Sequence, residues 1–345
     1  MNPIRPSKFP LQGLAAAAAL ACGALLTACG GGSDAAPPPT STPLSQPDAT
    51  ADAANSASTG DDTASALDAV IDTTSAIALA TATGSSATSD RGHAMSAGAS
   101  AASGVANVTV DCAGGGTATL SITGGTAASE LNGQLDAGEH YSVAYAQCTG
   151  QAGFAQLNGN VEMDVVSADH TTSPASVAVN VTVTGLTLSL PAGSATLAGS
   201  ASVSRSVASS GGSTTTTSHV TVPSATLATA FNARSGSFTL SDLDATRTVT
   251  AVAGVTTASQ YDGHHTLSGT ADGRTFSMTV ATTGNVSYDA GGALVAGAWT
   301  VVRPHATIAT TVANGMVVIT VDDGNDGTID HTWTFPAAQL DAAAG

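Results

Sequence analysis

Residues 177–183 read Val-Ala-Val-Asn-Val-Thr-Val, with valine at every second position. A strand places successive side chains on opposite faces, so this alternation predicts a β-strand with one buried and one exposed face. Valine and threonine also favour extended backbone. The same period returns in residues 117–122 (Thr-Ala-Thr-Leu-Ser-Ile) and 317–321 (Val-Val-Ile-Thr-Val). These segments predict an all-β fold.

Clusters of glycine, asparagine and aspartate separate the apolar runs from about Val105 onward, for example Asp136-Ala137-Gly138, Asn158-Gly159 and Gly291-Gly292. Such residues favour tight turns, so roughly 14 or more strands are expected to pair as antiparallel hairpins. We expect one large antiparallel sheet over residues 105–340. It would roll into a sandwich or a barrel-like body, because exposed sheet edges invite aggregation.

A local unit, Leu-x-Gly, recurs at Leu157–Gly159, Leu197–Gly199 and Leu267–Gly269. The spacing between units is irregular, whereas solenoid repeats recur at a fixed period. We therefore interpret the unit as a sign of duplicated hairpins.

Before the strands, residues 61–83 carry apolar side chains at helical spacing, including Leu67, Val70 and Ile71. This pattern predicts one short amphipathic helix that starts at Asp61 or Asp62. Residues 29–60 are mostly Gly, Ser, Ala, Pro, Thr and Asp, and are expected to form a disordered, flexible tether. The Gly/Ser/Ala-rich remainder of residues 61–104 is expected to be a loop.

The first 28 residues have the pattern of an export signal, with Arg5 and Lys8 before an apolar stretch from Leu11 to Leu26. This stretch ends in Leu26-Thr27-Ala28-Cys29, which resembles the lipobox of bacterial lipoproteins. The resemblance implies cleavage before Cys29 and acyl chains on that cysteine, which would anchor the protein in a membrane. Gly30, rather than aspartate, follows the cysteine, which implies transfer to the outer membrane. The alternative is an ordinary secretory signal.

The net negative charge of the chain restricts the partners that it can bind. The formal net charge is −17, and once the leader is removed six arginines face 25 acidic residues. Such a surface would not neutralise phosphates, so nucleic-acid binding is not expected. Anionic lipid headgroups would also repel it, so we expect the N-terminal lipid alone to provide the membrane contact.

Cys112 and Cys148 are the two cysteines that remain after cleavage and lipidation. Each follows or ends an expected strand, and an exported protein with two cysteines most simply pairs them in a disulfide. Two free buried thiols are the alternative. The surrounding residues, Asp111–Gly116 and Gln147–Gly150, are similar to a pattern in uncharacterised β-rich proteobacterial lipoproteins, which implies no activity.

The sequence has none of the familiar catalytic motifs: no G-x-S-x-G elbow, H-E-x-x-H pair, Walker A loop or dinucleotide fingerprint. Its one local cluster of reactive side chains is Asp262-Gly263-His264-His265. In a strand Asp262 and His264 share one face and His265 points to the other, so the two imidazoles would not bind one ion. A zinc or acid–base site could still assemble from dispersed histidines, namely His93, His140, His170, His219, His305 and His331.

An acidic segment between the last two expected strands, residues 322–330, is the candidate metal site. Ca²⁺ prefers six to eight oxygen ligands, and closely spaced carboxylates around a glycine turn supply them. The calcium hypothesis rests on Asp322, Asp323, Asn325, Asp326 and Asp330. The same residue types also favour a plain solvated turn, and the glutamate expected at the last position of an EF-hand loop is replaced by Trp333.

Two classes of function follow from these observations. The first is a lipid-anchored cell-envelope β protein with a non-enzymatic binding, adhesion or structural role and no cofactor besides weakly bound calcium. The alternative is a secreted hydrolase or metal-dependent enzyme whose site assembles from distant strands, with histidines and carboxylates gathered in one cleft.

Overall fold

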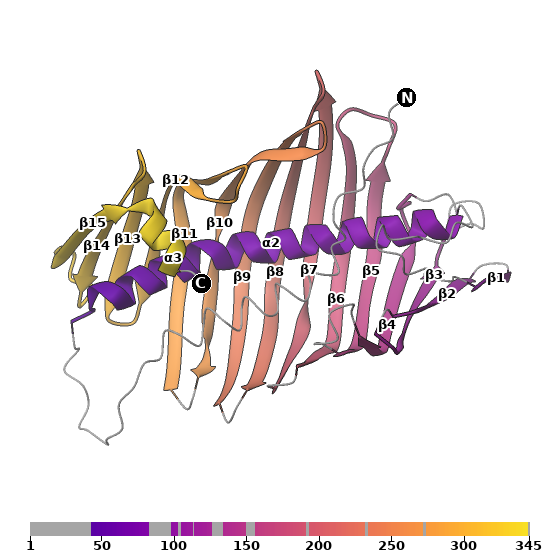
Figure 1. Cartoon of the computed structure of the whole chain (residues 1–345), viewed down its shortest axis with the longest axis horizontal. Helices are drawn as coiled ribbons and strands as arrows, with labels where there is room; N and C mark the ends of the chain where they lie inside the picture. Colours follow the sequence, from indigo (N-terminus) through magenta and orange to yellow (C-terminus); the bar gives the residue numbers. More distant parts are fainter. Residues whose placement is uncertain are drawn as a thin grey trace.

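The computed structural model of the chain describes residues 43–82, 98–102, 105–112, 114–125, 134–149, 156–190, 193–231, 234–271 and 274–343. Its strands form one antiparallel sheet of 15 strands, whose order across the sheet is the order along the chain. The predicted all-β antiparallel architecture is therefore confirmed. Strands β1 and β15 are its two ends (Figure 1).

The strands lengthen from the ends of the sheet toward its middle. They are β1 (Gly98–Ala102), β2 (Val105–Asp111), β3 (Thr117–Thr123), β4 (His140–Thr149), β5 (Gln156–Asp169), β6 (Ala175–Leu190), β7 (Gly193–Ser210), β8 (Ser213–Phe231), β9 (Arg234–Val252), β10 (Val255–Ala271), β11 (Arg274–Asp289), β12 (Leu294–Arg303), β13 (Ala306–Ala313), β14 (Met316–Asp323) and β15 (His331–Pro336).

A long helix, α2 (Gln46–Ala82), crosses the strands on one face of the sheet, which we call the inner face. The sheet curves around it, and a short helix, α3 (Ala337–Ala343), lies beside its first half near β13–β15 (Figure 1). Within the described residues, the helices α2 and α3, and not a second sheet, lie over the inner face. The last residues of the predicted β region, from Ala337 onward, are helical.

The predicted tether is wrong for residues 46–60, which are helical, and α2 is much longer than the short helix expected. The N-terminal cap is Ser45, whose hydroxyl accepts a bond from the Asp48 N–H, and not Asp61 or Asp62. Ala49 and Ala53 are fully buried. Alanine has the highest helix propensity and its small side chain permits close packing, so from Ala49 onward the segment packs against the rest of the protein. The expected 84–104 loop likewise contains strand β1.

The inner face is densely packed at the β12–β15 end. Trp299 of β12 is 1% exposed, and its indole N–H donates to the Ala53 carbonyl of α2 at 3.1 Å. Ile308 and Ile319, from β13 and β14, are completely buried beside it, and Leu340 of α3 is almost so. At this end the first turns of α2 and the short helix α3 close the hydrophobic core.

Candidate ligand-binding cavity

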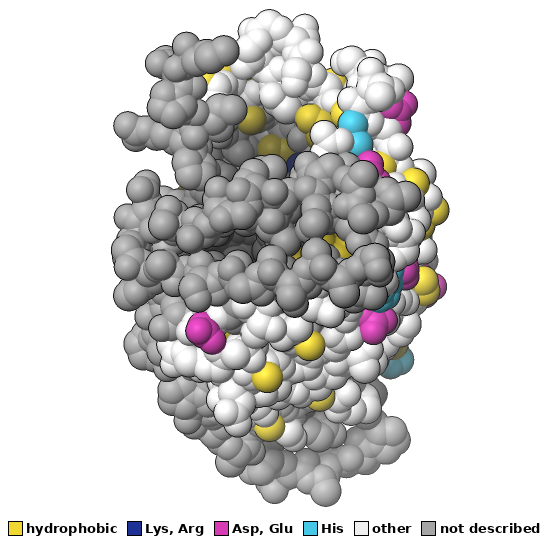
Figure 2. Space-filling view, turned by 90° about the vertical axis from the view of Figure 1, so that its right-hand side faces the viewer, with side chains coloured by type: hydrophobic (Ala, Val, Ile, Leu, Met, Phe, Trp, Pro, Cys, Tyr) yellow, Lys and Arg dark blue, Asp and Glu magenta, His cyan; other side chains and the backbone are white. Residues whose placement is uncertain are grey.

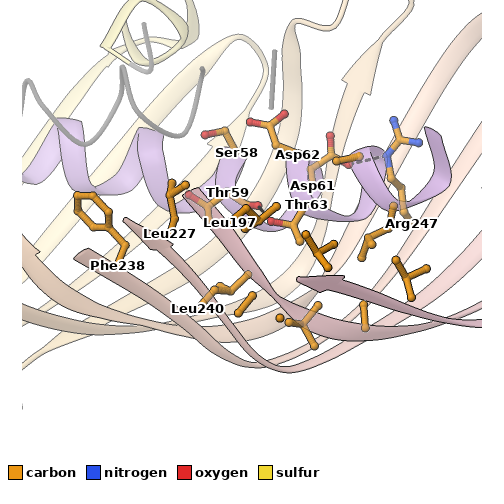
Figure 3. A pocket seen from close by; sticks show the side chains of 18 of the residues that line it. Ser58, Thr59, Asp61, Asp62, Thr63, Leu197, Leu227, Phe238, Leu240 and Arg247 are labelled. Atoms are coloured by element: carbon orange, nitrogen blue, oxygen red, sulfur yellow. Dashed lines mark hydrogen bonds and ion pairs between the residues drawn. The ribbon is translucent and has the colours of Figure 1, made fainter. Parts of the chain in front are cut away.

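A cavity of about 940 Å³ lies between the middle of α2 and the inner face of strands β5 to β11 (Figure 3). Helix residues from Asn55 to Leu67 form one wall, and the β11–β12 turn contributes residues 289–293. Ligand pockets in proteins typically have volumes of ≈ 300–1,000 Å³ and mostly apolar walls. The cavity therefore has the size of a ligand site.

The floor of the cavity is a ladder of large apolar side chains on adjacent strands. Leu186 of β6 is the register partner of Leu197 of β7, which pairs with Leu227 of β8, which pairs with Phe238 of β9. Leu240 of β9 forms a second, parallel row with Leu267 of β10. Figure 3 shows Leu240 below the helix and Leu197 beside Thr59 and Thr63.

The leucines of all three Leu-x-Gly units, Leu157, Leu197 and Leu267, line this cavity. The glycines of the units lie where backbones approach closely. A Cβ on Gly199 would lie 2.7 Å from the Ala225 Cα, and one on Gly269 would lie 2.1 Å from the Ser237 carbonyl oxygen. The unit thus couples a cavity-lining side chain to a close strand contact. Sequence reasoning noticed the unit but interpreted it as duplication, and so missed the cavity.

An ion-pair cluster fastens α2 to the sheet at one end of the cavity. Arg247 of β9 binds Asp61 at 2.9 Å and Asp68 at 3.7 Å, and all three side chains are largely buried. The Ser218 hydroxyl of β8 donates to the second Asp68 oxygen at 2.6 Å. Breaking a buried pair leaves a charge uncompensated, so this cluster fixes the position of the helix above the cavity.

Asp62 lies next to that cluster, at the point where the cavity meets solvent. Desolvation by the surrounding walls and, secondarily, the adjacent Asp61 carboxylate together raise the pKa of Asp62 to about 6, whereas Arg247 acts to lower it. The Asp62 side chain nevertheless stays exposed. Among the described residues none forms a hydrogen bond or ion pair with Asp62. Asp62 is therefore a carboxylate available to a ligand.

The Asp262–His265 cluster is divided between the two faces of the sheet, as expected. Asp262 and His264 are exposed on the outer face, where Asp262 bonds to Thr282 of β11. His265 is 1% exposed on the inner face, and neither ring nitrogen has a hydrogen-bond partner. Desolvation, with a smaller contribution from His264, lowers the pKa of His265 to about 4. His265 is therefore a neutral core residue at physiological pH.

On the outer face, two of the predicted histidines, His219 and His264, are neighbours of the same aspartate, Asp244. Asp244 of β9 is the register partner of His264 and binds the His219 ring of β8 at 2.9 Å. Even so, no group of three or more His, Cys, Asp or Glu side chains able to hold a metal ion occurs within the described residues.

The other histidines are dispersed. His140 bonds to Asp164 and His170 to the Leu135 carbonyl, His331 approaches Asp323, and His305 lies in the β12–β13 turn. His93 lies outside the described residues.

The acidic segment 322–330 is a turn stabilised largely by its own carboxylates. Asp322 accepts bonds from the backbone N–H groups of Asp326 and Gly327, at 3.1 and 2.8 Å. Asp330 accepts from the Asp323 N–H, and Asp326 from the Thr328 N–H. Asp323 also accepts from the Leu44 N–H, which joins the turn to the start of α2. Asn325 bonds to Thr307 and to the Arg303 carbonyl. Calcium binding here stays a prediction.

The remaining predicted sites are the cysteines, of which the structure describes two. Cys112 and Cys148 form the expected disulfide, with their Cα atoms 5.3 Å apart, which confirms the pairing. Cys29 and the leader lie outside the described residues. Among the residues that are described, no helix has the length and hydropathy needed to cross a membrane.

The outer surface differs from the cavity in chemistry. Its cross-strand contacts include hydroxyl pairs, such as Thr109 with Thr119 at 3.1 Å and Thr266 with Thr279 at 3.4 Å. Figure 2, which views the molecule from the side of β1–β5, shows described acidic side chains there as scattered single residues. Large apolar side chains of the described residues gather beneath α2, which makes the cavity the leading candidate site.

Comparison of the chain with protein-family models, curated protein sequences and solved structures gives no match.

Proposed function

We propose that this protein is a lipid-anchored, non-enzymatic binding protein of the bacterial outer membrane, and that its β domain holds an apolar molecule between α2 and the sheet. The observation that carries the proposal is the cavity of about 940 Å³ with its leucine-lined floor. Apolar surface gains free energy when a ligand removes it from water, at about 25 cal/mol per Å².

The anchor is the second part of the proposal and rests on the lipobox-like sequence Leu26-Thr27-Ala28-Cys29. Residues 30–42, between that cysteine and the first described residue, contain no large apolar side chain. Mass spectrometry of the protein purified from membranes tests the anchor. The expected result is an N-terminal Cys29 bearing acyl chains, whereas a mature terminus at another residue would contradict it.

Binding of N-phenyl-1-naphthylamine, a neutral apolar dye that fluoresces when removed from water, tests the cavity. We expect saturable binding by the full chain carrying Cys29→Ser, which removes the expected lipid-attachment thiol. Leu227→Trp places additional bulk on the cavity floor and is expected to weaken dye binding about tenfold, equivalent to about 1.4 kcal/mol.

The matched control is Val302→Trp, at an exposed position of β12. It adds the same ring away from the cavity and should leave dye affinity unchanged. Absence of saturable binding, or equal weakening by the two variants, would contradict a binding role for the cavity.

A further inference from the structure

The shape of the cavity floor restricts the shape of the ligand. Its large apolar side chains lie on six neighbouring strands, from Leu157 of β5 to Leu267 of β10. They form a row that steps from one register position to the next, since Leu188 pairs with Ala195 and Phe238 pairs with Gly269. At about 4.8 Å per strand spacing the row spans about 24 Å across the strands. One leaflet of a bilayer, half of the ≈ 30 Å hydrocarbon core, accommodates an acyl chain in about 15 Å. A row of this length suits a linear hydrocarbon chain that lies parallel to α2.

The charges of the cavity wall restrict the polar end of the ligand. Asp61, Asp62 and Asp68 lie within two turns of α2, and Arg247 is the cation that faces them among the described residues. Arg247 is occupied by Asp61 and Asp68, so it offers no free guanidinium to an anionic headgroup. Asp61, Asp62 and Arg247 line the cavity, and Asp68 adds a third carboxylate beside Arg247, so this part of the wall is negative, with Asp62 exposed.

The polar side chains of the helix near Asp62 accept or donate hydrogen bonds without adding charge. Ser58, Thr59 and Thr63 also line the cavity, and Figure 3 shows Ser58 beside Asp62 on the upper side of the helix, with Thr59 and Thr63 nearer to Leu197. A cation placed here would be attracted by the Asp62 carboxylate. Because this carboxylate is partly in water, the gain in binding free energy is modest, but it favours a cationic end over an anionic or uncharged one.

We propose that the cavity binds an amphiphile with a single linear hydrocarbon chain and a cationic polar end, with the chain on the leucine floor and the cation beside Asp62. This assignment rests on the proposed binding function and defines its ligand class. An anionic headgroup would meet the unpaired carboxylate, and an uncharged headgroup would gain only hydrogen bonds.

Displacement of bound N-phenyl-1-naphthylamine by three sixteen-carbon amphiphiles tests the assignment, with the same Cys29→Ser chain at pH 8. The probes are hexadecylamine, hexadecanol and hexadecanoate, each below the concentration at which it aggregates. We expect hexadecylamine to displace the dye at about tenfold lower concentration than hexadecanol, and hexadecanoate to be the weakest.

Asp62→Asn removes the charge and keeps the shape of the side chain. It should reduce the advantage of hexadecylamine over hexadecanol to less than about threefold while leaving hexadecanol displacement unchanged, which also shows that the variant is folded. Asp164→Asn, which removes an exposed carboxylate of β5, is the matched control and should keep the preference.

Two failures are distinguishable. If no probe displaces the dye, or no dye binds, the proposed function itself fails. If all three probes compete equally, or hexadecanoate competes best, or Asp62→Asn leaves the amine preference intact, the cavity binds hydrocarbon chains but the assignment of a cationic end beside Asp62 is overturned.

Discussion

The two regions of the inner face, the β12–β15 end and the β6–β11 middle, are built on the same alternation but are closed differently. Strands β12–β15 are 6 to 10 residues long, whereas β6–β11 are 16 to 19 residues long. At about 3.3 Å per residue the long strands span about 53–63 Å, and a helix with its side chains is only about 10–12 Å wide. The helices therefore cover the short strands but leave apolar surface uncovered on the long ones.

The cavity is therefore a result of strand length. At the short end Trp299 and the first turns of α2 fill the interior. In the middle the same helix presents Thr59 and Thr63 above leucines that it does not reach fully. If this is correct, substitutions that remove apolar bulk should be costly at the short end and tolerated on the cavity floor.

The largest expected effect is that of Trp299→Ala, because it empties the best-packed site and removes the bond to the Ala53 carbonyl. We expect a loss of about 3–5 kcal/mol in the free energy of unfolding, measured by denaturant titration. Leu227→Ala, at a half-buried position that already faces open space, should lose only about 1 kcal/mol. Equal losses would remove the contrast between the two regions.

An intermediate effect is expected in acid at His265, which is buried on the inner face of β10. Its pKa of about 4 is below the ordinary value of 6.5, so the unfolded chain binds the proton first as the pH falls. The stability that the neutral ring supplies is fully present above pH 6.5. As the pH falls from 6.5 to 4, the free energy of unfolding decreases by about 3 kcal/mol.

His265→Leu should abolish this part of the acid sensitivity. The measurement is the difference in unfolding free energy between the wild type and the variant at pH 7.5 and pH 4.5. A difference that does not change with pH would show that the ring is not desolvated in the folded protein.

The smallest expected effect is the stability contributed by Asp62, because its side chain is exposed. Its folded pKa of about 6 exceeds the ordinary value of 3.8, so the protonated form favours the folded state. That contribution is present below pH 4 and is lost as the pH rises through 6, the reverse of the His265 effect. Asp62→Asn should remove the loss, which we expect to stay under about 1 kcal/mol. Thermal melts at pH 4.5 and 7.5 measure it, and Asp111→Asn, at an exposed position of β2, is the control.

Much of the fold follows from the sequence because the side-chain period of a strand is two. Alternating valines at 177–183 predict β6, and the turn residues at Gly291-Gly292 predict a real turn. The motif Asn158-Gly159 looks the same but lies inside β5, at a register shift opposite Gly185. A local motif does not distinguish a turn from a bulge, because both need the same backbone freedom.

The errors in the helix and in the site have a common cause. Ala49 and Ala53 have no strong hydrophobic pattern of their own, and their burial depends on Trp299, some 250 residues away in the chain. The cavity likewise depends on how far α2 reaches over strands of different length. Partners that are distant in sequence leave no local signal, whereas the disulfide could be predicted because exported chains seldom keep two free thiols.

The order of the sheet has a consequence for how the chain acquires its structure. Every strand pairs with its neighbours in sequence, so the sheet contains few long loops to close and can grow one hairpin at a time, as in a repeat array. The contacts of α2 are the exception, because Asp61 and Arg247 are separated by 186 residues. A hairpin gained or lost in the middle of the array during evolution would lengthen or shorten the space beneath the helix without disturbing either end.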